Sequence, residues 1–122
     1  MIRNQTVCED ESNKILSKKG ASLLMFGGEH CGVCQVIWPQ LVAQLATRWP
    51  GLVLNYIDCE QHQECCAQQG VYSLPVVRLY FDGRLYLEEI QIFSLAPFIA
   101  GINELCAQYY EHDSSRDDER LL

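Results

Sequence analysis

Basic residues are scarce in this sequence. It holds 9 Lys and Arg against 16 Asp and Glu, which gives a formal net charge of −7. Nucleic-acid-binding proteins draw much of their affinity from Lys and Arg contacts to phosphate. Helices that lie on anionic membranes also need positive charge. We therefore expect neither a nucleic acid nor a membrane surface among the partners.

Long apolar runs are also missing. No stretch approaches the roughly 18 consecutive apolar residues that suggest a membrane span. Arg3 is not followed by the apolar segment of a secretory signal peptide, so none is expected. The 122 residues are 48% hydrophobic and 20% charged, which is the composition of one ordinary folded domain.

Repeated zinc-binding patterns are absent too. The sequence has one Cys-x-x-Cys, no second copy, and no His-x₃₋₅-His partner for it. The seven cysteines are an odd number, whereas a secreted disulfide framework usually has an even one. We therefore expect a reducing, cytoplasmic location, most thiols free, and no bound metal or other cofactor.

The Cys-x-x-Cys pair is the sharpest chemical feature of the chain. Cys31-Gly32-Val33-Cys34 follows the apolar run 21–26, which predicts a buried strand. Apolar residues at intervals of four follow the pair and predict a helix running to about Trp49, with Pro39 inside it. The pair therefore lies where a helix begins.

A helix start favours a thiolate, because unpaired backbone N–H groups and the positive end of the helix dipole meet there. Cys31 is accordingly the candidate nucleophile, and Cys34, one turn on, the candidate resolving thiol. Gly32 leaves room for the backbone of a partner. Two alternatives stay open from the residues alone: half of a zinc site, or an inert or regulatory pair.

The remaining pattern predicts an α/β domain with a mixed sheet of four to five strands and helices on both faces. An Asp82-Gly83 turn between apolar runs predicts a hairpin. The other expected elements are an edge strand within 2–7, a helix over 9–19, a strand over 52–57, a helix over 60–69 and a helix over 94–109. We expect residues 1–20 and 21–110 to belong to one domain and the acidic segment 111–122 to form a disordered tail.

From about Ala21 to Gln108 the chain resembles the thioredoxin family. The resemblance depends on the dithiol after a buried strand, Pro39 five residues past Cys34, a strand ending at Asp58, Pro75 in the segment 70–76, the hairpin, and the last helix. It implies a thioredoxin-like fold. It also implies that Pro75 is the family's cis-proline and that the backbone of Leu74 pairs with substrate. Gly32, Val33, Leu74 and Pro75 are thus the candidate substrate-binding residues, although Pro75 can also be read as an ordinary proline at a strand start.

The family's activity implies a thiol–disulfide oxidoreductase that reduces disulfides in client proteins and serves cell redox homeostasis. Its dithiol donor would be a thioredoxin reductase-type flavoenzyme or glutathione. The alternative is a thioredoxin-like client-binding or redox-sensing module with slow or no turnover.

Four departures from the family pattern bear on this choice. Val33 replaces the usual proline between the cysteines, and Met25 stands where thioredoxins carry a buried Asp that assists proton transfer at the second cysteine. The stretch Gly27-Gly28-Glu29 removes an aromatic residue from the rim of the site. The first strand of the family is only weakly indicated here.

His30 is a candidate modulator of the Cys31 pKa, because an imidazolium beside Cys31 would favour the thiolate and Glu29 would favour the imidazolium. The alternative is an exposed histidine without a role. Cys106 fits the apolar stripe of the last helix and is expected in the core. For Cys59, Cys65 and Cys66 the default expectation is incidental thiols, and the alternative is an accessory disulfide from Cys59 to one of the other two.

Overall fold

The structure is a computed structural model that describes residues 2–3, 19–91 and 94–121. Its elements are β1 (Ile2–Arg3), β2 (Ala21–Gly27), α2 (Gly32–Arg48), β3 (Val53–Asp58), α3 (Gln63–Gln68), β4 (Val76–Phe81), β5 (Arg84–Ile90) and α4 (Leu95–Leu121). Within the described residues the strands form one sheet in the order β1-β3-β2-β4-β5. β1, β3 and β2 are parallel, and β4 and β5 are antiparallel to their neighbours. The predicted mixed α/β sheet is confirmed.

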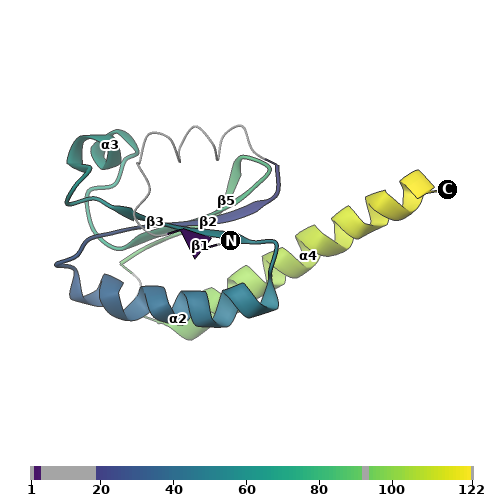
Figure 1. Ribbon diagram of the computed structural model, residues 1–122, viewed down its shortest axis with the longest axis horizontal. Coiled ribbons are helices and arrows are strands. Elements are labelled where there is room, and N and C mark those ends of the chain that lie inside the picture. Colours follow the sequence, from purple (N-terminus) through teal and green to yellow (C-terminus); the bar gives the residue numbers. More distant parts are fainter. Residues whose placement is uncertain (1, 4–18, 92–93, 122) are drawn as a thin grey trace.

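The central strand β2 is buried along its whole length because helices cover both faces of the sheet. Leu23 and Met25 point into a core shared with α2 and α4, whereas Leu24 and Phe26 point into a second core shared with α3. Figure 1 shows the same division, with α2 and α4 on one side of the sheet and α3 on the other. This two-sided burial explains why the sequence of β2 shows no polar alternation.

Helix α2 uses its four-residue apolar spacing to pack on the sheet. Ile37, Leu41 and Leu45 are buried, and Pro39 lies inside the helix as predicted. The helix ends at Arg48, before Pro50-Gly51. The helix begins at Gly32, shortly after β2 ends at Gly27, so the dithiol lies at that end of β2.

Two helix boundaries differ from the prediction. α3 starts at Gln63 rather than Glu60, because Asp58 accepts the main-chain N–H groups of Glu60 and His62 and holds this segment as a turn. α4 continues to Leu121 instead of ending near Tyr109, so the backbone of the expected tail is helical as far as Leu121. No glycine or proline follows Gly101, so nothing in the covalent backbone ends the helix earlier.

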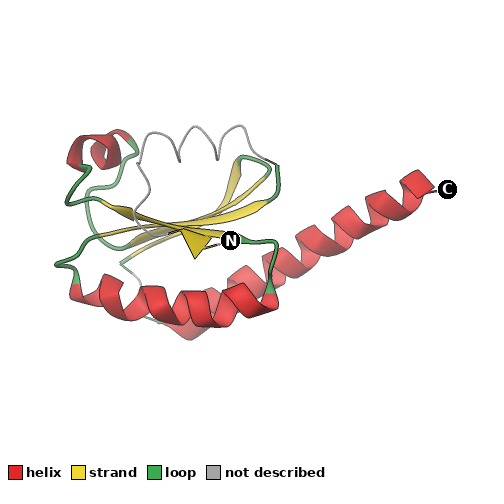
Figure 2. Cartoon of the chain, in the orientation of Figure 1, coloured by secondary structure: helices red, strands yellow, loops and turns green. Residues whose placement is uncertain are grey.

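The far end of α4 extends away from the sheet (Figure 2). Among the described residues, no helix combines the length and the apolar character that a membrane span requires. The helix expected over 9–19 lies almost wholly outside the described residues. Ile2–Arg3 forms the predicted edge strand beside β3.

Candidate active site

Cys31 and Cys34 form a disulfide with their Cα atoms 5.2 Å apart. Cys31 is the N-cap of α2, and its Sγ accepts the main-chain N–H of Cys34 at 3.2 Å. Cys34 is fully buried, whereas Cys31 is partly exposed. The sulfur at the positive end of the helix dipole is therefore also the one that solvent and a partner can reach.

The carbonyl of Gly28 holds the loop before the dithiol in place. It accepts the main-chain N–H of Cys31 at 3.2 Å, the side-chain amide of Gln35 at 2.9 Å and the hydroxyl of Tyr56 at 3.3 Å. These three donors come from the loop, α2 and β3. The loop is thus tied to two elements of the first core before the cysteines begin.

The other predicted site residues lie at the same end of the sheet. The Leu74–Pro75 peptide bond is cis. Pro75 precedes β4, whose Val76 pairs with Phe26 near the end of β2 from which the dithiol loop departs. Leu74 is half-buried against both cores, and Gly32 and Val33 are exposed on the first turn of α2. The fold brings these segments together although they lie some forty residues apart in sequence.

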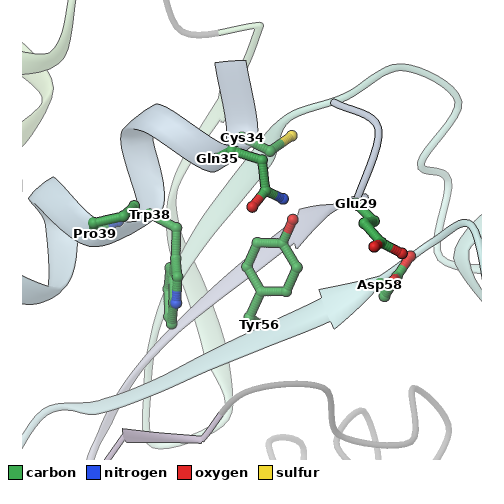
Figure 3. A pocket seen from close by; sticks show the side chains of 7 residues that line it. All are labelled: Glu29, Cys34, Gln35, Trp38, Pro39, Tyr56 and Asp58. Atoms are coloured by element: carbon green, nitrogen blue, oxygen red, sulfur yellow. The ribbon is translucent and has the colours of Figure 1, made fainter. Parts of the chain in front are cut away.

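A cavity of about 390 Å³ opens beside Cys34, lined mainly by residues of α2 and β3. Aromatic rings from α2 and β3 and carboxylates from the dithiol loop and the end of β3 surround it (Figure 3); it is lined by Glu29, Cys34, Gln35, Trp38, Pro39, Tyr56 and Asp58. The rings of Trp38 and Tyr56 lie 5.4 Å apart at a tilt. They supply aromatic surface near the dithiol, although the family's aromatic rim residue is missing.

Tyr56 keeps its proton in this cavity. Burial raises the pKa of Tyr56, and the negative charges of Asp58 and Glu60 raise it further. Its hydroxyl therefore acts as a donor. Met25, in the next strand, is fully buried in the same core as Cys34 and pairs with Tyr56 in the sheet. A thioether therefore stands in this core where the family carries an acid.

His30 has a partner that the sequence did not indicate. Its Nδ1 lies 2.6 Å from Oε1 of Glu60, and its main-chain N–H donates to Oε2 at 2.7 Å. The side chain of His30 is 85% exposed. The hydrogen bond and the charge of Glu60 raise the pKa of His30, and the charge of Glu29, named in the prediction, contributes less. Only the folded turn after β3 reveals this pair, because thirty residues separate its members.

The expectation that most thiols are free is wrong for the described part of the chain. Cys59 and Cys66 form a second disulfide with a Cα–Cα distance of 5.8 Å, because the turn after β3 lays α3 back over the strand end. Cys106 is the free cysteine among the described residues. It is buried in the first core, as predicted, and burial raises its thiol pKa to about 11. In the same part of the chain, no three His, Cys, Asp or Glu side chains are grouped to hold a metal ion.

The family model for thioredoxin matches residues 4–98. The chain belongs to the thioredoxin family. Its Cys31–Cys34 pair is a disulfide-forming Cys-x-x-Cys in a thioredoxin fold, the arrangement of thiol–disulfide oxidoreductases in this family.

Two curated proteins are similar to this chain in sequence. The chain is 32% identical over 59 residues to the thioredoxin-like protein YdfQ of Bacillus subtilis, which is 48% of this chain and 52% of that protein. It is 29% identical over 113 residues to DnaJ homolog subfamily C member 10 of Pongo abelii, which is 88% of this chain and 14% of that protein. The chain thus spans about half or less of the length of these relatives.

Solved thioredoxins share the fold at low sequence identity. Oxidised thioredoxin O2 of Arabidopsis thaliana superimposes with a TM-score of 0.73 at 14% identity, covering 85% of this chain and 93% of that one. Oxidised mitochondrial thioredoxin 3 of Saccharomyces cerevisiae gives 0.71 at 21% identity, with 84% and 94% covered. These likenesses support the thioredoxin-like fold.

Proposed function

We propose that this protein reduces disulfides in client proteins, with Cys31 as nucleophile and Cys34 as resolving thiol. The observation that carries the proposal is the difference in exposure between the two sulfurs. Cys31 is accessible at the helix N-cap, and Cys34 is buried one turn behind it. A client can reach the first sulfur and not the second.

The reaction balances in two exchanges. The Cys31 thiolate attacks one sulfur of the client disulfide, a mixed disulfide forms, and the other client sulfur leaves as a thiolate that takes up a proton. Cys34 then loses its proton and attacks Sγ of Cys31. The Cys31–Cys34 disulfide forms, and the second client thiolate leaves and is protonated. The client gains two electrons and two protons.

Gly32, Val33, Leu74 and Pro75 are the proposed contact surface for the client. Val33 is 50% exposed on the first turn of α2, and Leu74 is half-buried in the segment before β4. The backbone of Leu74, directly before Pro75, would offer hydrogen bonds to an extended client segment. His30 is the proposed modulator of the Cys31 pKa.

A dithiol donor must return the oxidised pair to the reduced state. Thioredoxin reductase-type flavoenzymes and glutathione are the donors we propose, and the protein itself needs no bound cofactor for the exchange. Participation in cell redox homeostasis follows from such a cycle.

Insulin reduction coupled to a thioredoxin reductase and NADPH tests the proposal. We expect turnover in the wild type and none in Cys31→Ser, while Cys106→Ser, a change at a buried thiol outside the site, retains turnover. Cys34→Ser should accumulate a mixed disulfide with insulin, because the resolving step is blocked. Turnover that survives Cys31→Ser would overturn the proposed mechanism.

A client-binding or redox-sensing module is the second candidate, and Met25 favours it. A buried thioether cannot accept the Cys34 proton, so the resolving step would be slow. A wild type that forms the mixed disulfide rapidly and releases insulin slowly would support the module over the reductase.

The cytoplasmic location also stays a prediction, and the Cys59–Cys66 disulfide argues against the reasoning behind it. Disulfides are rare in reducing compartments. Rapid alkylation of thiols in intact cells, followed by mass spectrometry, tests the location. Free Cys59 and Cys66 are expected in the cytoplasm, and an intact bond between them would indicate an oxidising compartment.

A further inference from the structure

Glu60 holds the residue that precedes the nucleophile with both of its carboxylate oxygens. Oε2 accepts the main-chain N–H of His30 at 2.7 Å, and Oε1 lies 2.6 Å from Nδ1 of its ring. One contact fixes the backbone of His30 and the other fixes its imidazole. A single acid from beyond β3 thus restrains both the path of the dithiol loop and the direction of an exposed side chain.

The structure is built to place this carboxylate. The main-chain N–H of Glu60 donates to Oδ1 of Asp58 at 2.8 Å, and that aspartate is 3% exposed. The N–H of Cys59 donates to the carbonyl of Gly27 at 2.8 Å, and the Cys59–Cys66 disulfide ties the same turn to α3. Two hydrogen bonds and one disulfide therefore hold the turn that carries Glu60.

Gly28 provides the space that the carboxylate occupies. A Cβ atom at this position would overlap the carboxylate of Glu60 and lie 2.9 Å from its Cγ. Any other residue would push the acid away from His30. Gly28 is one of the two glycines that depart from the family pattern. Its missing side chain lets the carboxylate of Glu60 approach the dithiol loop.

We propose that Glu60 is a positioning residue of the dithiol site and acts on Cys31 through the main chain and the imidazole of His30. The inference rests on the proposed function, since it concerns the reactivity of the same nucleophile. His30 occupies the position next to Cys31 in the chain, so both the direction and the charge of its ring bear on that sulfur.

The charges around His30 set the direction of the effect. Three acids raise the pKa of His30: Glu60, Glu29 and Asp58. Glu60 has the largest effect, first through its hydrogen bond and then through its charge, and a small loss of solvation lowers the pKa in the opposite direction. In return, hydrogen bonds from His30 and its positive charge lower the pKa of Glu60. The pair therefore keeps an imidazolium beside Cys31 at higher pH than an isolated histidine would. A stabilised thiolate favours the reduced dithiol and makes the pair a stronger oxidant.

Titration of His30 by NMR in the full-length protein is the first test. Glu60→Gln should lower the pKa of His30, and Glu60→Asp, which keeps the charge and shortens the reach, should lower it less. Glu64→Gln removes the same charge from an exposed residue of α3 and should leave it unchanged. An unchanged His30 pKa in Glu60→Gln would overturn the inference.

A double-mutant cycle on Cys31 is the second test. Glu60→Gln should slow alkylation of reduced Cys31 at neutral pH by about threefold, the size expected of one exposed charge. A His30→Ala background keeps the main-chain N–H that Glu60 binds and removes the imidazole. The same change should therefore have a smaller effect there, because only the main-chain route remains. An equal effect in both backgrounds would contradict the inference. Both tests measure the site without turnover, so a wild type that fails to reduce insulin would overturn the proposed function and leave this inference standing.

Discussion

Sγ of Cys31 accepts the main-chain N–H of Cys34 at 3.2 Å, so the nucleophile caps the helix that contains its own resolving thiol. A cap of this kind satisfies one of the free N–H groups of the helix start. An anionic sulfur accepts such a bond more strongly than a neutral one. The same contact that begins α2 thus favours the reactive form of Cys31.

Cys31 and Cys106 should differ strongly in reactivity. Cys106 is fully buried and its thiol pKa is raised to about 11, so on the order of one molecule in ten thousand carries its thiolate at pH 7. In the reduced, folded protein we expect iodoacetamide to label Cys31 first and Cys106 only after unfolding in urea, as read by peptide mass spectrometry. Equal labelling of the two in the folded protein would contradict the capped-thiolate argument.

The Cys59–Cys66 disulfide should stabilise the fold. The bond closes a loop with a sequence separation of 7 residues, and a loop of this size restricts the unfolded chain by about 2–3 kcal/mol. Cys59→Ser/Cys66→Ser should therefore lower the free energy of unfolding by about that amount in urea titrations. In the presence of dithiothreitol the difference between the two proteins should disappear, because the wild type then lacks the bond as well. A difference that persists under reduction would point to packing instead.

Met25→Asp should destabilise the fold and raise the rate of disulfide reduction. The side chain is fully buried in the first core with Cys34, and burying a carboxyl there should cost about 2 kcal/mol or more. Burial also raises the pKa of such an acid, which suits proton exchange with Cys34 at neutral pH. We expect insulin reduction to rise by about tenfold while the urea midpoint falls.

Met25→Leu is the matched control, since it keeps volume and apolar character and should cost less than about 1.5 kcal/mol. Its turnover should equal that of the wild type. If the aspartate variant shows no gain over the leucine variant, proton transfer at Cys34 does not limit the rate.

The sequence predicted those parts of the molecule that depend on local pattern. The hairpin predicted at Asp82-Gly83 forms between strands Val76–Phe81 and Arg84–Ile90, because both turn residues adopt the positive φ angles that a tight turn needs. The helix start at the dithiol likewise follows from residues close in sequence.

Features that depend on distant segments could not be predicted in this way. Glu60 reaches His30 across 30 residues, and the cavity beside Cys34 joins side chains of α2 and β3. For these cysteines the sequence favours incidental thiols, with a bond from Cys59 to Cys65 or Cys66 as the alternative. The sequence alone does not show that the turn before α3 lays Cys66 against the end of β3. Each of these depends on sheet order and on how a turn closes, which only the folded chain determines.

The pair of His30 and Glu60 should also give the stability of the protein a characteristic pH dependence. Folding raises the pKa of His30 above 6.5, so its contribution is complete below that pH and is lost as pH rises through the folded value. Folding lowers the pKa of Glu60 below 4.5, so its contribution is complete above that pH and is lost as pH falls through the folded value. The contributions of His30 and Glu60 to stability are therefore both complete between about pH 4.5 and 6.5.

We therefore expect the loss of unfolding free energy in Glu60→Gln, measured by urea titration, to be largest within that window and to shrink on both sides of it. The exposure of both side chains to solvent keeps the effect small, and added salt should reduce it further. Glu64→Gln should show no such maximum. A loss in Glu60→Gln that stays constant from pH 4 to pH 9 would mean that the carboxylate acts through its hydrogen bond to the main chain of His30 and not through the charge of the ring.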